Sequence, residues 1–192
     1  AAPPMSRYPI LIPPPTENIM KIQLKKVRLS FPALFEAKSF EDNDPKFEAT
    51  FLIDKKSPVL KEMLLTIDAV AKEKWAAKAD GVMKTLNAAG KVCLRDGADK
   101  EYDGYENCMF VKASSKKRPL VVDLDGKTPL VEADGRPYGG CIVNGYIDIW
   151  AMDNQFGKRI AASLSSVQFA GDGEPFGAKA TADVYESEED LT

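Results

Sequence analysis

Two neighbouring segments with β-strand character constrain the fold of this chain more than any other part of it. In residues 141–152, small or aliphatic side chains alternate with polar and aromatic ones, and residues 159–169 form a second β-rich run. Residues 153–157 between them have the composition of a hairpin turn. Because alternate side chains of a strand point to opposite faces, these segments predict an antiparallel hairpin with one apolar face. Its polar face carries Tyr146 and Trp150, which we expect to be exposed.

Further strand signals lie earlier in the chain. Residues 20–29 alternate between apolar and polar with a one-residue slip at Lys25 and Lys26, which predicts a strand with a β-bulge. A second β-rich run, 47–53, follows turn-forming residues at 41–45, so the two runs predict a hairpin with a long loop. Shorter strands are expected over 91–94, 108–113 and 120–122.

A helical region interrupts these strands. Ser57 and Pro58 are typical of an N-cap and a first helical position. A second, shorter helix is expected over about 80–89, ended by Gly90 in a left-handed conformation. Strands on both sides of an inserted helical pair, without a repeat, predict a mainly β protein with inserted helices (α+β), built on a small β-barrel. The predicted buried stripe of the first helix is Leu60, Met63, Leu64, Ile67, Val70, Ala71 and Trp75.

The chain is predicted to form one domain with two loose ends. With 192 residues and 44% hydrophobic composition it can bury one core, which we place in residues 20–170. Residues 1–19 hold six of the 13 prolines and predict a flexible, extended lead-in. Residues 171–192 predict a flexible linker and an acidic tail, whose carboxylates are Asp183, Glu186, Glu188, Glu189 and Asp190.

The acidic tail changes the charge balance of the rest of the chain. The tail holds five of the 29 acidic residues and none of the 26 basic ones, so residues 1–182 carry 26 basic against 24 acidic residues. An acidic tail that can bind to the mildly basic rest of the chain and dissociate from it suits a protein that binds a polyanion and must also release it. Nucleic acid is the first candidate for that partner.

Several classes of function are excluded by the residues that are missing. The chain has no histidine, which rules out His-dependent nucleophilic and general-base catalysis and HExxH metal sites. Cys93, Cys108 and Cys141 are far apart and lack a CxxC pair, so we expect buried thiols in a reducing compartment rather than zinc ligands. Without a phosphate-binding loop motif, use of ATP is not expected. We expect no metal, no cofactor and no enzymatic activity.

No apolar run approaches the roughly 20 residues of a membrane helix, and the start lacks the order of a secretory signal. The sequence therefore predicts a soluble intracellular protein without membrane contact.

Basic and aromatic residues cluster in and around the loops of the predicted barrel. Cations and hydroxyls that follow a strand can bind successive phosphates, and tyrosines on glycine-containing loops can stack on bases at ~1–3 kcal/mol each. The structural alternatives are a solvated basic loop, ordinary surface tyrosines, and a tryptophan packed beneath a loop. The phosphate-binding candidates are Lys112, Lys116, Lys117, Arg118, Arg136 and Arg159, and the stacking candidates are Tyr102, Tyr105, Tyr138 and Trp150.

A carboxylate-only, metal-dependent nuclease is a second hypothesis. Asp123, Asp125, Glu132 and Asp134 lie within a short span, as a metal site would need. Against this, the glycines that follow two of these aspartates make them hairpin-turn signals.

Six strings in order along the chain carry a resemblance to a known family. They are VRLSFPALFEAK at 27–38, AKEKW at 71–75, GKVCLRDG at 90–97, YDGY at 102–105, SKKRP at 115–119 and IDIWAMDN followed by FGKRI at 147–160. These strings resemble the bacteriophage single-stranded DNA-binding proteins formerly described only as a domain of unknown function. The resemblance covers residues 21–169 and implies an OB-fold, a five-stranded β-barrel.

The resemblance also implies a function. Such a protein coats and protects single strands in phage DNA replication or recombination, with little sequence preference, in the cytoplasm of the infected bacterial host. An acidic tail in related proteins competes with DNA and docks replication proteins such as a polymerase or helicase. This tail ends in Leu191 and Thr192 rather than in an aromatic residue, so docking through the last residue is not implied. A homodimer is compatible with this interpretation, and a replication protein-interaction module that touches DNA little is a third hypothesis.

Overall fold

The computed structural model describes residues 19–39, 41–100, 102 and 104–176. Within these residues the chain forms seven strands, two α-helices and three short 3-10 turns. The predicted lead-in up to residue 18 and the acidic tail lie outside the described residues. The strands are β1 (Ile19–Lys38), β2 (Lys46–Asp54), β3 (Leu94–Asp96), β4 (Cys108–Ser115), β5 (Leu120–Val122), β6 (Ile142–Asn154) and β7 (Gly157–Gly171), the helices are α1 (Pro58–Trp75) and α2 (Ala79–Ala88), and the turns are η2 (Ala76–Lys78), η3 (Gly97–Asp99) and η4 (Glu132–Asp134).

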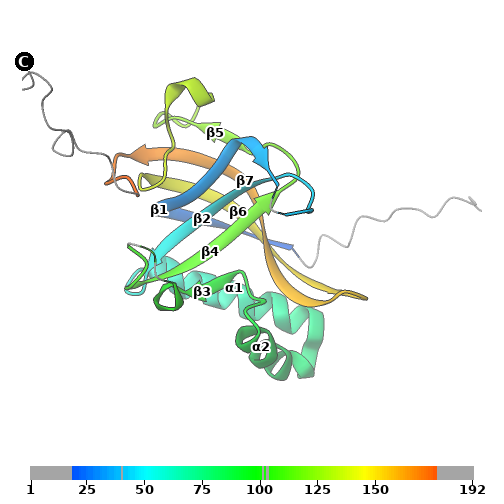
Figure 1. Ribbon diagram of the computed structural model, residues 1–192. Coiled ribbons are helices and arrows are strands. Elements are labelled where there is room, and N and C mark those ends of the chain that lie inside the picture. Colours follow the sequence, from blue (N-terminus) through cyan, green and yellow to red (C-terminus); the bar gives the residue numbers. More distant parts are fainter. Residues whose placement is uncertain (1–18, 40, 101, 103, 177–192) are drawn as a thin grey trace, which may run out of the picture.

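Five of the strands close into a barrel (Figure 1). The long strand β1 lies between β2 and β6 and is antiparallel to both, while β4 continues the sheet beyond β2 and β7 continues it beyond β6. A parallel bridge between Ser114 of β4 and Ser163 of β7 closes the sheet on itself. The short strands β3 and β5 lie outside the closed ring, on β4 and β7. The predicted small β-barrel with inserted helices is thereby confirmed.

The barrel interior is filled by alternate residues of every long strand. Leu24, Phe51 and Ile147 are each 0% exposed. Gly145 suits this packing, because a Cβ atom there would lie 3.0 Å from the ring of Phe51, closer than an ordinary contact. Exposed or half-buried residues alternate with buried ones along β6, so the predicted two-faced strand is confirmed.

Helix α1 packs against one end of the barrel (Figure 1). Its buried residues are Met63, Ile67, Val70, Ala71 and Trp75, as the helical period predicts. The prediction that Leu64 is buried is wrong, because its side chain is 51% exposed. At about 100° per residue, Leu64 lies on the same side of α1 as Ala71 and Trp75, so its exposure shows that the barrel does not cover this side of the helix at Leu64. The Trp75 indole Nε1 donates to Asp153 at 2.9 Å and ties α1 to the hairpin of β6 and β7.

The structure agrees with three local predictions from the sequence, namely the β-bulge, the helix N-cap and the glycine after the second helix. The β1–β6 pairing shifts register between Leu24 and Val27, where Lys26 has a φ of +50°, so the predicted bulge is confirmed. The Ser57 side chain accepts from the Val59 backbone N–H at 3.2 Å. Gly90 follows α2 with a φ of +67°.

The strand predicted at 91–94 begins later than expected, at Leu94. Lys91 and Cys93 exchange backbone hydrogen bonds with Ile160 of β7, which draws residues 91–93 toward β7 before the chain joins β4. This detour brings the segment after α2 next to β7, and it helps to form the groove described below.

All three cysteines are free thiols. Cys141 is buried as predicted, whereas Cys93 and Cys108 are half-buried. Burial raises the pKa of the Cys93 thiol to about 12 and that of Cys141 to about 11, so both stay protonated at neutral pH. No helix in the described ranges is long and apolar enough to cross a membrane.

Candidate nucleic-acid interface

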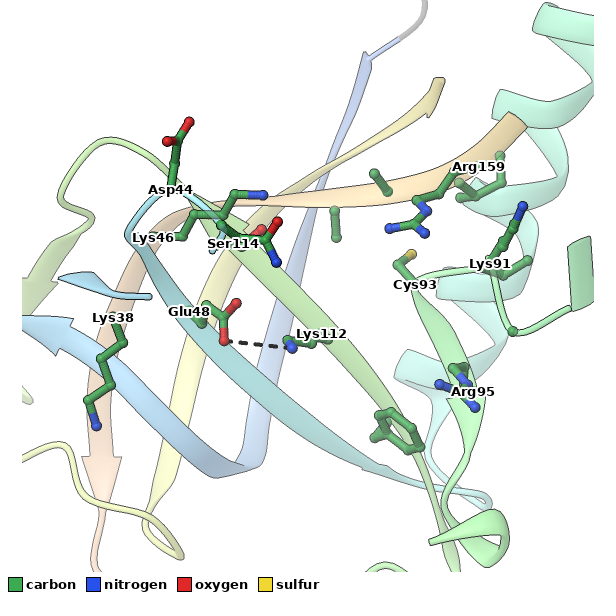
Figure 2. A pocket seen from close by; sticks show the side chains of 17 residues that line it. Lys38, Asp44, Lys46, Glu48, Lys91, Cys93, Arg95, Lys112, Ser114 and Arg159 are labelled. Atoms are coloured by element: carbon green, nitrogen blue, oxygen red, sulfur yellow. Dashed lines mark ion pairs between the residues drawn. The ribbon is translucent and has the colours of Figure 1, made fainter. Parts of the chain in front are cut away.

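A basic groove runs across the outside of the barrel where β2, β4, β7 and residues 90–95 meet (Figure 2). Its volume is about 470 Å³. Cations outnumber carboxylates along it, which suits a polyanion held by its phosphates. The cationic lining residues are Lys38, Lys46, Lys91, Arg95, Lys112 and Arg159, and the carboxylates are Asp44 and Glu48.

The two-residue period of β4 explains why cations face outward here. Val111 and Ala113 point into the barrel and are 0% exposed, whereas Lys112 between them is exposed. On the neighbouring strand β2, Thr50 lies opposite Lys112 and Glu48 lies opposite Ser114. The outer face of this strand pair is therefore polar at these positions and becomes apolar at Leu52 and Phe110, while its inner face belongs to the core.

An aromatic cluster continues from the end of the groove. We define it as Phe31, Tyr102, Tyr105, Phe110 and Phe176. The ring centroids are 5.2 Å apart for Phe31 and Tyr102, and 5.3 Å apart for Tyr102 and Tyr105. Tyr105 then lies 5.6 Å from Phe110 and 6.5 Å from Phe176. Phe110, which is 7% exposed, lines the groove and packs against Tyr105, so the aromatic cluster adjoins the groove.

Phe31 and Tyr102 are the accessible members of the aromatic cluster. Phe31 is 60% exposed and Tyr102 is 48% exposed, so each ring has surface available for a base. Phe31 has a φ of +45° at a register shift between Ser30 and Ala33. A left-handed backbone at a bulky residue costs on the order of 1–3 kcal/mol and is concentrated at functional sites. This strained bend exposes the apolar ring of Phe31 to solvent.

Tyr105 has a different role from the one predicted for it. It is only 2% exposed, and its hydroxyl donates to Ser30 Oγ at 2.7 Å. Burial raises the pKa of this hydroxyl. A ring without accessible faces cannot stack on a base, so the predicted stacking role does not fit Tyr105. It packs beneath Tyr102 and supports that ring instead.

The predicted basic cluster is divided by the structure. Lys112 lines the groove together with Arg159, which comes from β7. Lys116 Nζ lies 3.5 Å from Asp44 at the end of the groove. Lys117 is exposed just beyond β4, and the Arg118 guanidinium lies 5.8 Å from the centre of the Phe35 ring.

Three other predicted residues are not brought to the groove. Arg136 donates to Asp123 at 2.6 Å, and Tyr138 shares hydrogen bonds with Asp172 and with the backbone of Gly173. Trp150 is half-buried, and its indole donates to Ser163 Oγ at 2.9 Å. Each of these side chains has a structural partner within the fold, and none of the three lines the groove.

Three of the four carboxylates of the nuclease hypothesis serve turns and ion pairs. Asp123 binds Arg136, which lowers the pKa of the Asp123 carboxyl. Asp125 accepts from the side chain and backbone of Thr128, and Asp134 accepts from a backbone N–H at 2.7 Å. Among the residues that the structure describes, no three Asp, Glu, Cys or His side chains form a group that could hold a metal ion. The structure therefore gives the nuclease hypothesis no support.

The groove also contains cations that sequence reasoning did not select. These cations come from three separate segments that meet only in the folded protein: Lys38 from β1, Lys46 from β2, and Lys91 and Arg95 from residues 90–95. Arg95 is the register partner of Phe110 in the β3–β4 ladder, and its guanidinium lies 5.7 Å from that ring centre. The available signal was weak: Lys91 and Arg95 both lie in the string GKVCLRDG, but nothing local shows that they face Lys112.

Comparisons with known proteins identify the family of this chain. Residues 20–191 match the family described as Enterobacter phage Enc34, ssDNA-binding protein. A protein named p50 from Acyrthosiphon pisum secondary endosymbiont phage 1 is 42% identical over 171 residues, which cover 87% of this chain and 92% of p50.

Two solved structures of phage single-stranded DNA-binding proteins are similar to this one. The single-stranded DNA-binding protein from bacteriophage Enc34, in complex with ssDNA, has a TM-score of 0.68 and 28% identity, covering 82% of this chain and 89% of that one. The gp2.5 single-stranded DNA-binding protein of bacteriophage T7 has a TM-score of 0.55 at 16% identity, covering 88% and 96% of the two chains, and shows the shared fold alone. The predicted OB-fold is confirmed by these likenesses.

Proposed function

This chain belongs to the family of phage single-stranded DNA-binding proteins represented by that of Enterobacter phage Enc34, and from this premise we propose that it binds single-stranded DNA along the basic groove and the aromatic cluster. Homology to these proteins supports DNA binding itself. The path of the strand over named residues is our inference from the geometry.

The observation that carries the proposal is the position of Phe110, which lines the basic groove and packs against Tyr105 of the aromatic cluster, so that the two features lie next to each other. A DNA strand that follows the groove can place its phosphates on four cations, Lys91, Arg95, Lys112 and Arg159. It can then reach the exposed rings of Phe31 and Tyr102. Phosphates are held by charge, and bases stack on rings regardless of their identity. Binding of this kind has little sequence preference.

Stacking is assigned to the two accessible rings, Phe31 and Tyr102, with Tyr105 and Phe110 packed beside them. Lys116, Lys117 and Arg118 lie beyond the end of β4 and extend the positive surface for a longer strand. Arg136, Tyr138 and Trp150 are left out of this path because their side chains are held by partners elsewhere.

We also propose that the acidic tail competes with DNA. The last described residue, Phe176, packs in the aromatic cluster, with Arg28 over its ring at 3.8 Å from the ring centre. Arg28 further donates to the backbone oxygens of Glu174 and Gly140, which anchors this end of the chain. The five carboxylates of residues 183–192 come shortly after Phe176 in the sequence, and Phe176 lies beside the proposed DNA surface.

We propose the biological role from the family to which the chain belongs. We propose that the protein coats and protects single strands during phage DNA replication or recombination in the cytoplasm of the infected host. The tail would then also be available to replication proteins whenever DNA has displaced it.

A fluorescence-polarisation titration of labelled oligo-dT tests the proposed path. Replacing Lys112 and Arg159 with glutamine should weaken binding and reduce the slope of log K against log salt by ~0.7 for each lost phosphate contact. Lys61→Gln with Lys74→Gln on α1 makes the same charge change away from the groove and should leave the slope nearly unchanged.

Two outcomes would contradict the proposed function. Absence of binding by the wild-type protein, or binding that does not respond to salt, would remove its electrostatic basis. Degradation of the oligonucleotide on addition of magnesium or manganese would favour the nuclease hypothesis instead.

A further inference from the structure

Two carboxylates of the basic groove face cations that we assign to phosphate binding. Glu48 Oε2 lies 3.7 Å from Lys112 Nζ, as the dashed line in Figure 2 shows. Asp44 Oδ2 lies 3.5 Å from Lys116 Nζ. Both carboxylates come from β2 or the loop before it, and both cations come from the neighbouring strand β4 or its end. The groove thus brings its own anions to its phosphate-binding cations.

The fold does not depend on these ion pairs. Strands β2 and β4 pair without a register shift from Phe47 and Ser115 to Asp54 and Cys108, so backbone hydrogen bonds hold the two strands together. The Lys112 side chain is 60% exposed and that of Glu48 is 33% exposed, and exposed ion pairs contribute little to stability. The position of Glu48 therefore calls for an explanation other than folding.

We propose that Glu48 is an internal competitor for Lys112, which a DNA phosphate must displace. This inference rests on the proposed function and adds a residue that limits affinity. A carboxylate and a phosphodiester are both oxyanions, and each can accept from the same ammonium group. In the free protein Lys112 already has an anionic partner, so a phosphate replaces an existing interaction instead of creating a new one.

This arrangement has two physical consequences. Single-stranded DNA binds less tightly than the number of cations in the groove suggests, and this weaker affinity keeps binding reversible. Salt screens the exposed ion pair, so the influence of Glu48 should be greatest at low salt and should fade as salt rises. Asp44 and Lys116 are more exposed, with side chains 77% and 72% accessible, so Asp44 should compete less than Glu48.

The test compares Glu48→Gln and Asp44→Asn with the wild-type protein in oligo-dT titrations at low and moderate salt. Glu48→Gln should tighten binding about threefold at low salt, the range expected for loss of one exposed ion pair, and the gain should shrink at moderate salt. Asp44→Asn should give a smaller gain. The control is Glu62→Gln on α1, which makes the same charge change outside the groove and should give less than either.

A double-mutant cycle separates competition for Lys112 from simple repulsion of phosphates. If Glu48 acts through Lys112, Glu48→Gln gives no gain in a Lys112→Gln background. A gain that persists in that background would show direct repulsion and overturn the inference. Unchanged affinity of Glu48→Gln in the wild-type background would overturn it as well, while leaving the proposed function standing. If the wild-type protein binds no DNA, the proposed function fails and this inference fails with it.

Discussion

The hydroxyl of Tyr105 donates to the hydroxyl of Ser30 across 2.7 Å, in the interior between β1 and the loop that precedes β4. Tyr105 is 2% exposed, and so is Ser30. This bond fixes the ring on which Tyr102 packs, and Tyr102 in turn contacts Phe31. The orientation of the two exposed rings therefore depends on one buried hydrogen bond.

Tyr105→Phe should reduce stability. The change removes one hydroxyl and leaves the buried Ser30 hydroxyl without this partner, which should lower the free energy of unfolding by ~1–2 kcal/mol. Urea denaturation measures the loss. Tyr102→Phe, at a ring that is 48% exposed, is the matched control and should change the unfolding free energy by less than about 0.5 kcal/mol. Equal losses in the two variants would show that the buried bond has no special importance.

Phe31→Ala and Tyr102→Ala should each weaken DNA binding by ~1–3 kcal/mol, because each removes one ring on which a base can stack. Neither variant changes a charge, so the slope of affinity against salt should stay the same. Leu65→Ala is the control, because Leu65 is 62% exposed on α1 and does not line the groove. Oligo-dT titration checks all three, and losses no larger than that of the control would exclude stacking on these rings.

Truncation after Ala182 should tighten DNA binding. An internal competitor at an effective concentration of ~1 mM raises the apparent Kd about tenfold if its own Kd is about 0.1 mM, so its removal should give a gain of that order at low salt. A full-length variant with the five tail carboxylates replaced by amides separates charge from chain length. Weaker binding by the truncated protein at low salt would disprove competition by the tail.

Asp123 should make stability depend on pH in the acidic range. The hydrogen bond from Arg136 lowers the pKa of the Asp123 carboxyl in the folded protein. Its contribution to stability is therefore complete above the unfolded pKa of about 3.9 and is lost as pH falls through the folded value. The difference in unfolding free energy between wild type and Asp123→Asn should shrink between about pH 5 and about pH 2. Urea unfolding over that range checks this, with Glu132→Gln as a control at an exposed carboxyl nearby. A difference that does not vary with pH would contradict the assignment.

Much of the fold could be read from the sequence, because its signals are local. The period of β6, the slip at Lys25 and Lys26, the Ser57 cap and the Gly90 stop each depend on neighbouring residues and on backbone preferences. The excess of basic residues in the body and the acidic end of the chain were equally visible as composition. Leu64 shows the limit of this information, because the helical period alone does not say how much of the apolar side of the helix the barrel covers.

The proposed interface depends on tertiary structure. Arg95 and Arg159 are far apart along the chain, and they line one groove with Lys112 only because β4 pairs with β3 on one side and approaches β7 on the other. Tyr105 looks like a loop tyrosine in the sequence, yet the fold buries it against Ser30. A charged or aromatic residue has the same local signature whether it faces solvent, an ion-pair partner or the core. Strand register and closure of the barrel make that choice, and both are set by contacts between residues distant in sequence.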